Sequence, residues 1–427
     1  MLKEKVFVID YEVVSPISTG AHQLKDSIIN GECAEKTITR FPVAGIPFKN
    51  GAEINKDLTP LYSNESDLIK RICSYDRKLE LLASCYGLAK NRLKPLISKL
   101  NPSRTGVILG VGADVTPFEF FETELSQYII THQNPMAGLF TEMNHNNSRA
   151  NIVGNPYDIY AIYLANKFNA GAFQKSILTA CVSSTQAIGL AYDTIASGEV
   201  DVVIAGGTDS IINMLAMISF GKLGIIPSSS SEFSCKPFDI NRNGTLAGEC
   251  AGFTIIASSK FIESNNIKPI AQILGYGNTL DGYKITAPDP SGKSISKAIS
   301  HALKNSNIEP SMIDYINAHG TGTKHNDDLE LKCYQQVFGN SFSGIPISST
   351  KGQHGHAIAA AGIQEFCVLM NCLENDILPA NVNLTSPNNE EANLVRETQS
   401  KKIKYALTSN FAFGGINTVL AVKNEIL

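Results

Sequence analysis

The sequence predicts an α/β protein in which helices cover β-sheets, and two observations support this. First, short β-branched runs alternate with helical patterns along the whole chain, an order typical of this class. Second, the alternation restarts after about residue 265, so the chain reads as two successive α/β units. The 427 residues are enough for one large core or two fused ones.

The predicted strands follow one another in chain order. In the first half they are KVFVID (5–10), TGVILGVG (105–112), KSILTA (175–180), VDVVIAGG (200–207) and FTIIAS (253–258). In the second half they are PIAQILGYG, DYINAHG (314–320), IPISST (345–350) and NTVLAVK (417–423).

The two halves also contain similar motifs in the same order. In the first, a strand ends at TAC, a helix follows, and GECAGFTIIAS closes the half; in the second, a strand ends at STK, a small-residue helix follows, and FGGINTVLAVK closes the chain. We therefore expect one unit over 1–260 and a second over 261–427, with the chemistry where they meet. The Asn-rich and aromatic-rich segment 113–157 is expected to be an excursion that wraps a pocket or an interface.

Composition narrows the classes of function. The chain is 43% hydrophobic and 18% charged with a net charge of −4, so no global basic field indicates nucleic acid. The N-terminal run has acids inside it and no small-residue cleavage site, and no apolar stretch reaches the length of a membrane span. We expect a cytoplasmic protein.

Nine cysteines are scattered along the chain without a CxxC pair. An odd number at irregular spacing predicts reduced thiols rather than a disulfide framework or a zinc site. Most free cysteines are inert core residues, and eight of the nine are interpreted in that way.

Cys181 is the exception. A predicted strand ends at Cys181, and a helix begins at about Val182, with apolar residues at helical spacing and Gly198 placed to end it. Cys181 thus lies in the first turn of a helix, where free N–H groups and the helix dipole favour the thiolate. Its small neighbours leave room for a substrate.

Two histidines follow predicted strands in Gly-rich segments, His319 in NAHGTGT and His356 in STKGQHGHAIAAAG. A lone histidine is more often a satisfied core or surface residue, but two of them beside an elbow cysteine make coincidence less plausible. Two neutral imidazoles can donate hydrogen bonds to one developing enolate oxygen. His354 competes with His356, which is preferred because AIAAAG follows it directly.

Three charged residues could support this site. Lys351 could balance charge near it, since an apolar strand precedes the lysine. Asp327 and Glu330 lie at helical spacing beyond His319, where they could pair with Lys351, orient a water or cap a helix.

Six motifs in order carry a resemblance to a known family. They are TACVSSTQAIG, PFDINRNGTLAGECAG, TAPDPSG, NAHGTGTKHNDDLE, STKGQHGHAIAAAG and SNFAFGGIN. Together they resemble the elongating β-ketoacyl-[acyl carrier protein] synthases and the type II polyketide ketosynthases, well over residues 160–425 and loosely over 1–160. The resemblance implies the thiolase-like fold, a duplicated α/β unit in αβαβα layers, and an obligate dimer.

The resemblance also implies roles for single residues. Cys181 matches the acyl-accepting nucleophile, His319 and His356 the decarboxylation pair, Lys351 the lysine of the STK motif, and Glu330 the acid after the first histidine.

Four further residues match motifs around the nucleophile. Thr321 and Thr323 match the threonines that hold the phosphopantetheine arm, and Phe411 matches the gating phenylalanine. Phe413 matches the residue whose N–H joins that of Cys181 as the oxyanion hole.

The expected reaction is therefore a decarboxylative condensation of an acyl group on Cys181 with a malonyl unit on an acyl carrier protein. It implies no intrinsic metal or redox cofactor, because the phosphopantetheine belongs to the partner. Carrier proteins are acidic, so Lys70, Arg71 and Lys222 are candidate docking residues. The dimer is expected with a second copy or with a ketosynthase-like paralogue.

The chain departs from the family pattern at several places. VIDYEVVSPIS replaces the usual Gly-rich N-terminal strand and turn, GEGAG has become GECAG with Cys250, and residues 113–157 match poorly. These departures favour a specialised polyketide or polyene pathway over housekeeping fatty acid synthesis.

Three other functions compete. A non-catalytic chain-length factor would share the fold but lack the nucleophile, which is present here. A biosynthetic thiolase would need a second cysteine near the C-terminus, and none follows Cys372. A coenzyme A-primed initiating synthase would carry Asn where His356 stands.

Overall fold

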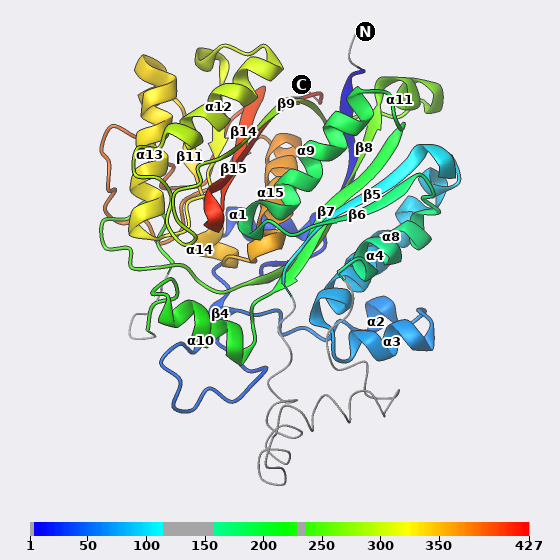
Figure 1. Ribbon diagram of the computed structural model, residues 1–427, viewed down its shortest axis with the longest axis horizontal. Coiled ribbons are helices and arrows are strands. Elements are labelled where there is room, and N and C mark those ends of the chain that lie inside the picture. The colour runs from blue at the N-terminus through cyan, green and yellow to red at the C-terminus, as the bar shows by residue number, and fades with distance from the viewer. Residues whose placement is uncertain (1–3, 114–156, 229–234, 427) are drawn as a thin grey trace.

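The computed structural model describes residues 4–113, 157–228 and 235–426. Its largest feature is a mixed sheet in the order β11-β10-β14-β15-β9-β1-β8-β7-β5-β6 (Figure 1). The strands of the first half are β1 (Val6–Ser15), β5 (Thr105–Val111), β6 (Phe173–Ile177), β7 (Val202–Ser210) and β8 (Glu249–Ser258). Those of the second half are β9 (Ala271–Leu280), β10 (Tyr315–Asn317), β11 (Ile347–Ser348), β14 (Tyr405–Phe411) and β15 (Ile416–Asn424).

The two halves of this sheet repeat one pairing pattern. In the first, β6, β5 and β7 are parallel neighbours, and β8 and β1 continue the sheet antiparallel. In the second, β11, β10 and β14 are parallel neighbours, and β15 and β9 continue it antiparallel. Both halves order their strands third, second, fourth, fifth, first in chain sequence, so the duplicated α/β unit predicted from the sequence is confirmed.

Strand β1 joins the two halves into one sheet. It pairs with β8 from Val6 to Val14, and its first residues, Val6 to Val8, pair also with β9 on the other side. The short β2 (Ser18–Thr19) folds back on β1, while β3 (Glu35–Thr37) with β4 (Asn50–Ala52) and β12 (Ile377–Leu378) with β13 (Gln399–Ser400) form two small separate ribbons.

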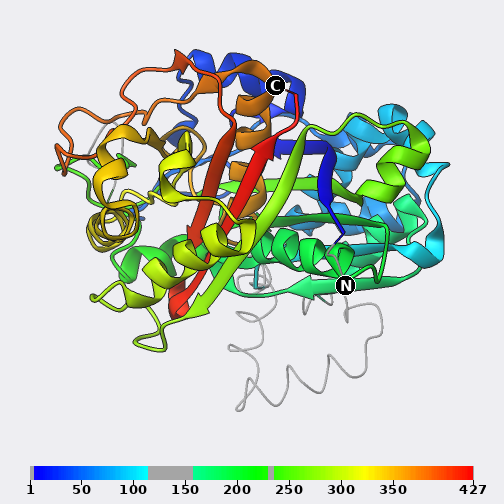
Figure 2. The same cartoon turned by 90° about the horizontal axis from the view of Figure 1, so that it is seen from above.

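Helices form three layers around the sheet, and this completes the expected αβαβα order. Helices α4 (Arg77–Ile97) and α8 (Ile159–Phe168) cover the outer face of the first half, and α12 (Lys293–Ser306) with α13 (Lys324–Phe338) covers that of the second. Between the halves lie α9 (Ser183–Ala196) and α15 (Ala361–Asn375), which pack on each other and on strands of both halves (Figures 1 and 2).

The remaining helices are shorter. They are α1 (Ala21–Ile29), α2 (Thr59–Tyr62), α3 (Asp67–Cys73), α10 (Met214–Lys222), α11 (Ser259–Asn265) and α14 (Lys351–His354), of which α14 is buried throughout. Within the described part of the chain, no helix combines the length and the apolar character needed to cross a membrane.

The central helices explain why the site is buried. In α15 every residue from Ala361 to Leu373 is buried, including Gln364 and Glu365. Helix α9 buries the face that carries Ile188, Ala191 and Ile195, as its apolar spacing predicts. It ends at Ala196, and Gly198 takes the left-handed φ of +79° expected of a residue that stops a helix. Helix α9 begins soon after β6, and α15 follows β11 after α14 and a 3-10 turn; their first turns meet, because a Cβ at Gly362 would lie 2.0 Å from the Thr185 hydroxyl.

Candidate active site

Cys181 lies at a sharp elbow after β6. The chain makes a 3-10 turn over Ala180–Val182, and α9 begins one residue after that turn, at Ser183. Ala180 adopts a φ of +52°, a left-handed conformation that is uncommon for a residue with a side chain and that marks local strain. A Cβ at Gly110 of β5 would lie 2.3 Å from the backbone nitrogen of Ser184, so a glycine is needed for this close approach. The elbow is thus held from behind by backbone packing.

His319 lies in the loop that follows β10, and one acidic side chain binds the backbone of this loop. Glu330 of α13 accepts hydrogen bonds from the backbone N–H groups of His319 (2.7 Å) and Gly320 (2.8 Å). It also accepts a bond from the Tyr334 hydroxyl at 2.9 Å. Burial raises the pKa of Glu330 to about 7. Glu330 therefore contacts the backbone that carries His319 and shapes the loop.

His356 follows β11 and α14, and its backbone is fixed at both ends. Its N–H donates to Leu246 O at 2.7 Å, and its carbonyl accepts from the Gly248 N–H at 3.1 Å. These contacts place the Nε2 atom of its ring 3.1 Å from the Sγ atom of Cys181. The Nδ1 atom is buried and has no hydrogen-bond partner in the part of the chain that the structure describes.

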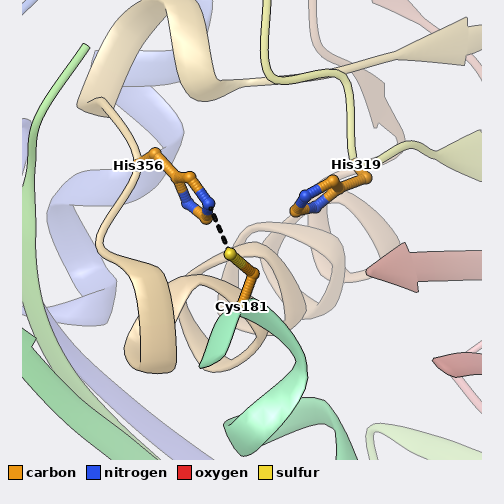
Figure 3. Close-up of side chains that lie close together, drawn as sticks. All are labelled: Cys181, His319 and His356. Carbon is orange, nitrogen blue, oxygen red and sulfur yellow. Dashed lines mark hydrogen bonds between the residues drawn. The ribbon is translucent and has the colours of Figure 1, made fainter. Parts of the chain in front are cut away.

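The three side chains come together at one point (Figure 3). The Cys181 sulfur and one ring nitrogen of each of His319 and His356 lie within 4.8 Å of one another, and all three residues are buried. The two imidazole rings meet edge to face with their centroids 5.4 Å apart. Cys181 comes from the first half of the chain and both histidines from the second, so the site spans the two units.

His354, the competitor of His356, has its own partners. Its Nε2 lies 2.8 Å from the Thr350 hydroxyl and its Nδ1 lies 2.7 Å from Gly355 O. Both ring nitrogens are thus engaged away from the sulfur, and His356 is the histidine that reaches Cys181.

Lys351 forms a fully buried ion pair with Glu365 of α15. Its Nζ also donates to His319 O at 2.5 Å and lies 3.2 Å from His319 Nδ1. The suggested pairing of Lys351 with Asp327 or Glu330 is therefore wrong: helix α15 brings a different acid within reach.

Asp327 accepts hydrogen bonds from backbone and forms a buried ion pair with Arg242 (3.7 Å), so it contacts neither Lys351 nor the catalytic residues. It accepts from the N–H groups of Phe238 (2.8 Å) and Gly322 (3.2 Å), and burial raises its pKa to about 6. Helix α13 has Thr323 at its N-cap with no side-chain cap bond, so the capping interpretation does not describe Asp327 either. Asp327 joins the His319 loop to the segment at Phe238.

The electrostatics correct the expected resting state of Cys181. Burial raises the pKa of the Cys181 thiol to about 12, more than the nearby Lys351 cation and the Phe413 N–H lower it. The start of α9 therefore does not hold a thiolate in the resting protein, because desolvation outweighs the favourable partial charges. Burial, helped by Lys351, likewise lowers the pKa values of His319 and His356 well below the ordinary range. The resting site is a neutral thiol beside two neutral imidazoles.

The loop after β14 faces the sulfur from the other side. The backbone N–H of Phe413 lies close enough to Cys181 to lower the pKa of its thiol, which puts this donor beside the sulfur. The buried Phe411 ring lies edge to face on His319, with centroids 5.9 Å apart. Gly414 and Gly415 follow with φ of +79° and +75°.

The other predicted site residues lie in three places. Thr321 and Thr323 stand in the His319 loop with their hydroxyls 2.9 Å apart. Lys70 and Arg71 lie on α3, where Lys70 is 3.8 Å from Asp67, and Lys222 is exposed at the end of α10. Residues 114–156 lie outside the described residues, so the expected pocket excursion stays a prediction.

Two residues at the centre were not anticipated. Glu365 pairs with Lys351, and Asn410 of β14 donates to Glu365 Oε2 at 2.6 Å. Both are fully buried. The sequence does contain an indication of Glu365, because it is an acidic residue within an otherwise apolar helical run (AGIQEFCVLM).

Comparison with known proteins places the chain among condensing enzymes. The model described as "Beta-ketoacyl synthase, N-terminal domain" matches residues 3–260, and the corresponding C-terminal domain model matches residues 270–385. The 3-oxoacyl-[acyl-carrier-protein] synthase 2 of Synechocystis is 29% identical, with 99% of this chain and 98% of that protein aligned.

Two solved structures share the fold at lower identity. A type II polyketide ketosynthase in complex with its acyl-carrier protein superposes with a TM-score of 0.84 at 24% identity, covering 99% of this chain and 100% of that one. The ishigamide ketosynthase/chain length factor also gives 0.84, at 22% identity and 99% coverage of each chain. The thiolase-like arrangement predicted from the sequence is thereby confirmed.

Proposed function

Because the chain belongs to the β-ketoacyl synthase family of acyltransferases, we propose that it joins an acyl group held on Cys181 to a malonyl unit carried by an acyl carrier protein. The observation that carries the proposal is the meeting of the Cys181 sulfur with His319 and His356 inside 4.8 Å. The product is a 3-oxoacyl thioester two carbons longer.

The first half-reaction transfers the acyl group. The Cys181 sulfur attacks the carbonyl carbon of the incoming thioester, with His356 Nε2–H, 3.1 Å away, as a hydrogen-bond donor beside it, and the thiol proton is passed on to the leaving group. The N–H groups of Cys181 and Phe413 hold the oxygen that becomes negative. The carrier thiolate then leaves and takes the proton, so that Cys181 holds the acyl group and the site is neutral again.

The second half-reaction forms the carbon–carbon bond. The malonyl carboxylate leaves as CO2, and its electron pair forms an enolate whose oxygen accepts hydrogen bonds from His319 and His356. The enolate carbon attacks the acyl carbonyl on Cys181. The Cys181 thiolate leaves and takes up one proton from solvent, which balances the CO2 lost from a carboxylate.

Neutral imidazoles suit this second step. The pKa values of both rings lie well below the ordinary histidine range, so each ring nitrogen that carries a proton is a hydrogen-bond donor without a full charge. The buried Lys351–Glu365 pair beside them is neutral overall. The proposed cycle needs no resident metal or redox cofactor, since the phosphopantetheine arm arrives with the carrier protein.

We propose a dimer that forms through the edge strand β6. This strand ends the sheet, and its residues Phe173–Ile177 are exposed or half-exposed. An exposed edge offers unpaired backbone groups to a second chain. The exposed Leu178 and Tyr157 lie beside it. The second chain is a copy or a paralogue, as in the ishigamide ketosynthase/chain length factor.

We further propose that acidic carrier proteins dock at Lys70, Arg71 and Lys222, which are partly or fully exposed. We also propose that the protein works in a specialised polyketide or polyene pathway, because the segments VIDYEVVSPIS and GECAG depart from the family pattern.

Mass spectrometry tests the central proposal. Incubation with acyl thioesters of different lengths should add one acyl group, located at Cys181, and Cys181→Ala should remove the adduct while the protein still releases CO2 from malonyl carrier protein. Absence of an adduct with every thioester, together with absence of CO2 release, would instead support a non-catalytic partner subunit of the chain-length-factor type.

A further inference from the structure

Asn410 occupies a position from which it can decide which nitrogen of His319 carries the proton. Its amide Nδ2 lies 3.2 Å from His319 Nδ1 and donates to Glu365 Oε2 at 2.6 Å. Asn410, His319 and Glu365 are all buried. An amide nitrogen has two protons and no acceptor capacity, so one proton points at Glu365 and the other at His319.

The orientation of the Asn410 amide follows from its neighbours. The Thr185 hydroxyl donates to Asn410 Oδ1. Turning the amide over would place Oδ1 against the Glu365 carboxylate, where two acceptors would face each other. Thr185 is itself held closely, because a Cβ at Gly362 would lie 2.0 Å from its hydroxyl oxygen. The nitrogen of Asn410 therefore faces His319.

A second donor faces the same ring nitrogen. Lys351 Nζ lies 3.2 Å from His319 Nδ1, and an ammonium group also donates only. With two donors aimed at it, Nδ1 has to be the unprotonated nitrogen of a neutral ring. The proton of His319 is then on Nε2, at the far edge of the ring, which points toward Cys181 (Figure 3).

We infer that Asn410 is a positioning residue that holds His319 in the Nε2–H tautomer, so that this histidine can donate to the enolate oxygen. The inference rests on the proposed function and specifies which step depends on Asn410. Acyl transfer to Cys181 uses the Cys181 and Phe413 N–H groups and His356, so it does not need the His319 tautomer. Decarboxylation does need it, because an Nδ1–H ring would present a lone pair, not a donor, to the enolate.

The test separates the two half-reactions. Asn410→Leu, of similar volume, removes both donated bonds and should lower malonyl decarboxylation by about tenfold or more, while acylation of Cys181 stays within about twofold. Thr185→Val removes the hydroxyl that holds the Asn410 amide, so the amide can turn and the rate of decarboxylation should also fall. Thr185→Ser keeps that hydroxyl and should keep the wild-type rate of decarboxylation. Asn371→Leu, at a buried asparagine of α15 that donates to Ala21 O, is the matched control.

Nitrogen-15 NMR of the histidine rings gives the tautomer directly. The wild-type His319 signals, assigned by comparison with His319→Gln, should show an unprotonated Nδ1 and a protonated Nε2, and Asn410→Leu should mix the tautomers. Equal losses of acylation and decarboxylation, unchanged decarboxylation in Asn410→Leu, or a protonated Nδ1 in the wild type would each overturn the inference. A wild-type protein inactive in both half-reactions would overturn the proposed function instead, and the NMR measurement would still test the tautomer.

Discussion

The Nε2 atom of His356 lies 3.1 Å from the sulfur of Cys181, while Nδ1 of the same ring has no partner among the described residues. The ring is therefore oriented by the backbone bonds of His356 to Leu246 and Gly248 and not by a second side chain. Because no described residue accepts a hydrogen bond from Nδ1, an imidazolium would leave one N–H unsatisfied in this buried site. The geometry favours a neutral ring beside a neutral thiol.

We expect the reactivity of Cys181 in the resting enzyme to rise with pH without levelling off near neutrality. A pKa raised to about 12 means that the thiol form predominates below that value and that the thiolate fraction grows as pH increases. The rate of alkylation by iodoacetamide, followed by mass spectrometry at Cys181 from about pH 6 to about pH 9, measures this.

A plateau of the alkylation rate across neutral pH would contradict this prediction, because it would indicate a thiolate paired with an imidazolium. The half-exposed Cys33 supplies an internal comparison in the same digest.

Alanine substitution at either histidine should reduce decarboxylation by about 10²–10³-fold, the usual effect of losing one donor to an oxyanion. The two pKa shifts also determine how decarboxylation should depend on pH. Since burial lowers both histidine pKa values, the rings stay neutral as pH falls, and the acid limb of decarboxylation should lie below the ordinary histidine range. CO2 release by Cys181→Ala, measured against pH, checks this; an acid limb centred near about pH 6.5 would show ordinary histidines.

The strands themselves and the placement of the site residues after strands could be predicted because local pattern determines them. The runs beginning at Thr105 and Ile416 form buried strands close to the predicted bounds, whereas the strand beginning at Val6 extends five residues beyond its predicted end, to Ser15. Cys181, His319 and His356 each follow such a strand, so their proximity follows from the topology once the duplication is recognised.

The supporting contacts could not be predicted in the same way. Lys351 and Glu365 are separated by one helical turn, a loop and the start of α15, and which acid reaches the lysine depends on how α15 packs between the sheet halves. The pKa of Cys181 also depends on desolvation, which the helix-start argument does not include. The local sequence shows which residues are charged and at what spacing the apolar residues recur. Which charged side chains pair, and how deeply they are buried, depends on tertiary packing.

Lys351→Met should destabilise the protein strongly. Removing the ammonium leaves the Glu365 carboxylate buried with no cation, which typically costs about 3–5 kcal/mol in free energy of unfolding. Lys351→Met combined with Glu365→Gln should recover part of that loss. Denaturant unfolding measures both, and Lys167→Met, at a partly exposed pair with Glu65, should cost about 1 kcal/mol or less. Equal costs at the two lysines would refute the buried-pair argument.

The loop that carries the Phe413 N–H depends on two glycines that differ in their surroundings. Gly414 and Gly415 both have left-handed φ values, so alanine at either position carries a strain of about 1–2 kcal/mol. A Cβ at Gly415 would also lie 1.8 Å from Asp281 Oδ1, whereas a Cβ at Gly414 meets nothing within 4 Å. Gly415→Ala should therefore displace the loop and slow acylation of Cys181 far more than Gly414→Ala. Similar acylation rates in the two variants would show that the position of this loop does not control acyl transfer.

An acidic residue beside the free edge of the sheet should weaken the proposed dimer. Leu178 follows β6 directly and is 42% exposed, so a second chain paired along β6 would bury it. Leu178→Asp would place a carboxylate in that apolar contact, and size-exclusion chromatography with light scattering should then show a shift from dimer to monomer. Met312→Asp is the matched control, because Met312 is equally exposed (42%) but lies in the 3-10 turn Pro310–Met312 of the other half. If Leu178→Asp stays dimeric while Met312→Asp dissociates, the interface does not run along β6. Since the site itself is built within one chain, monomeric Leu178→Asp should still accept an acyl group on Cys181.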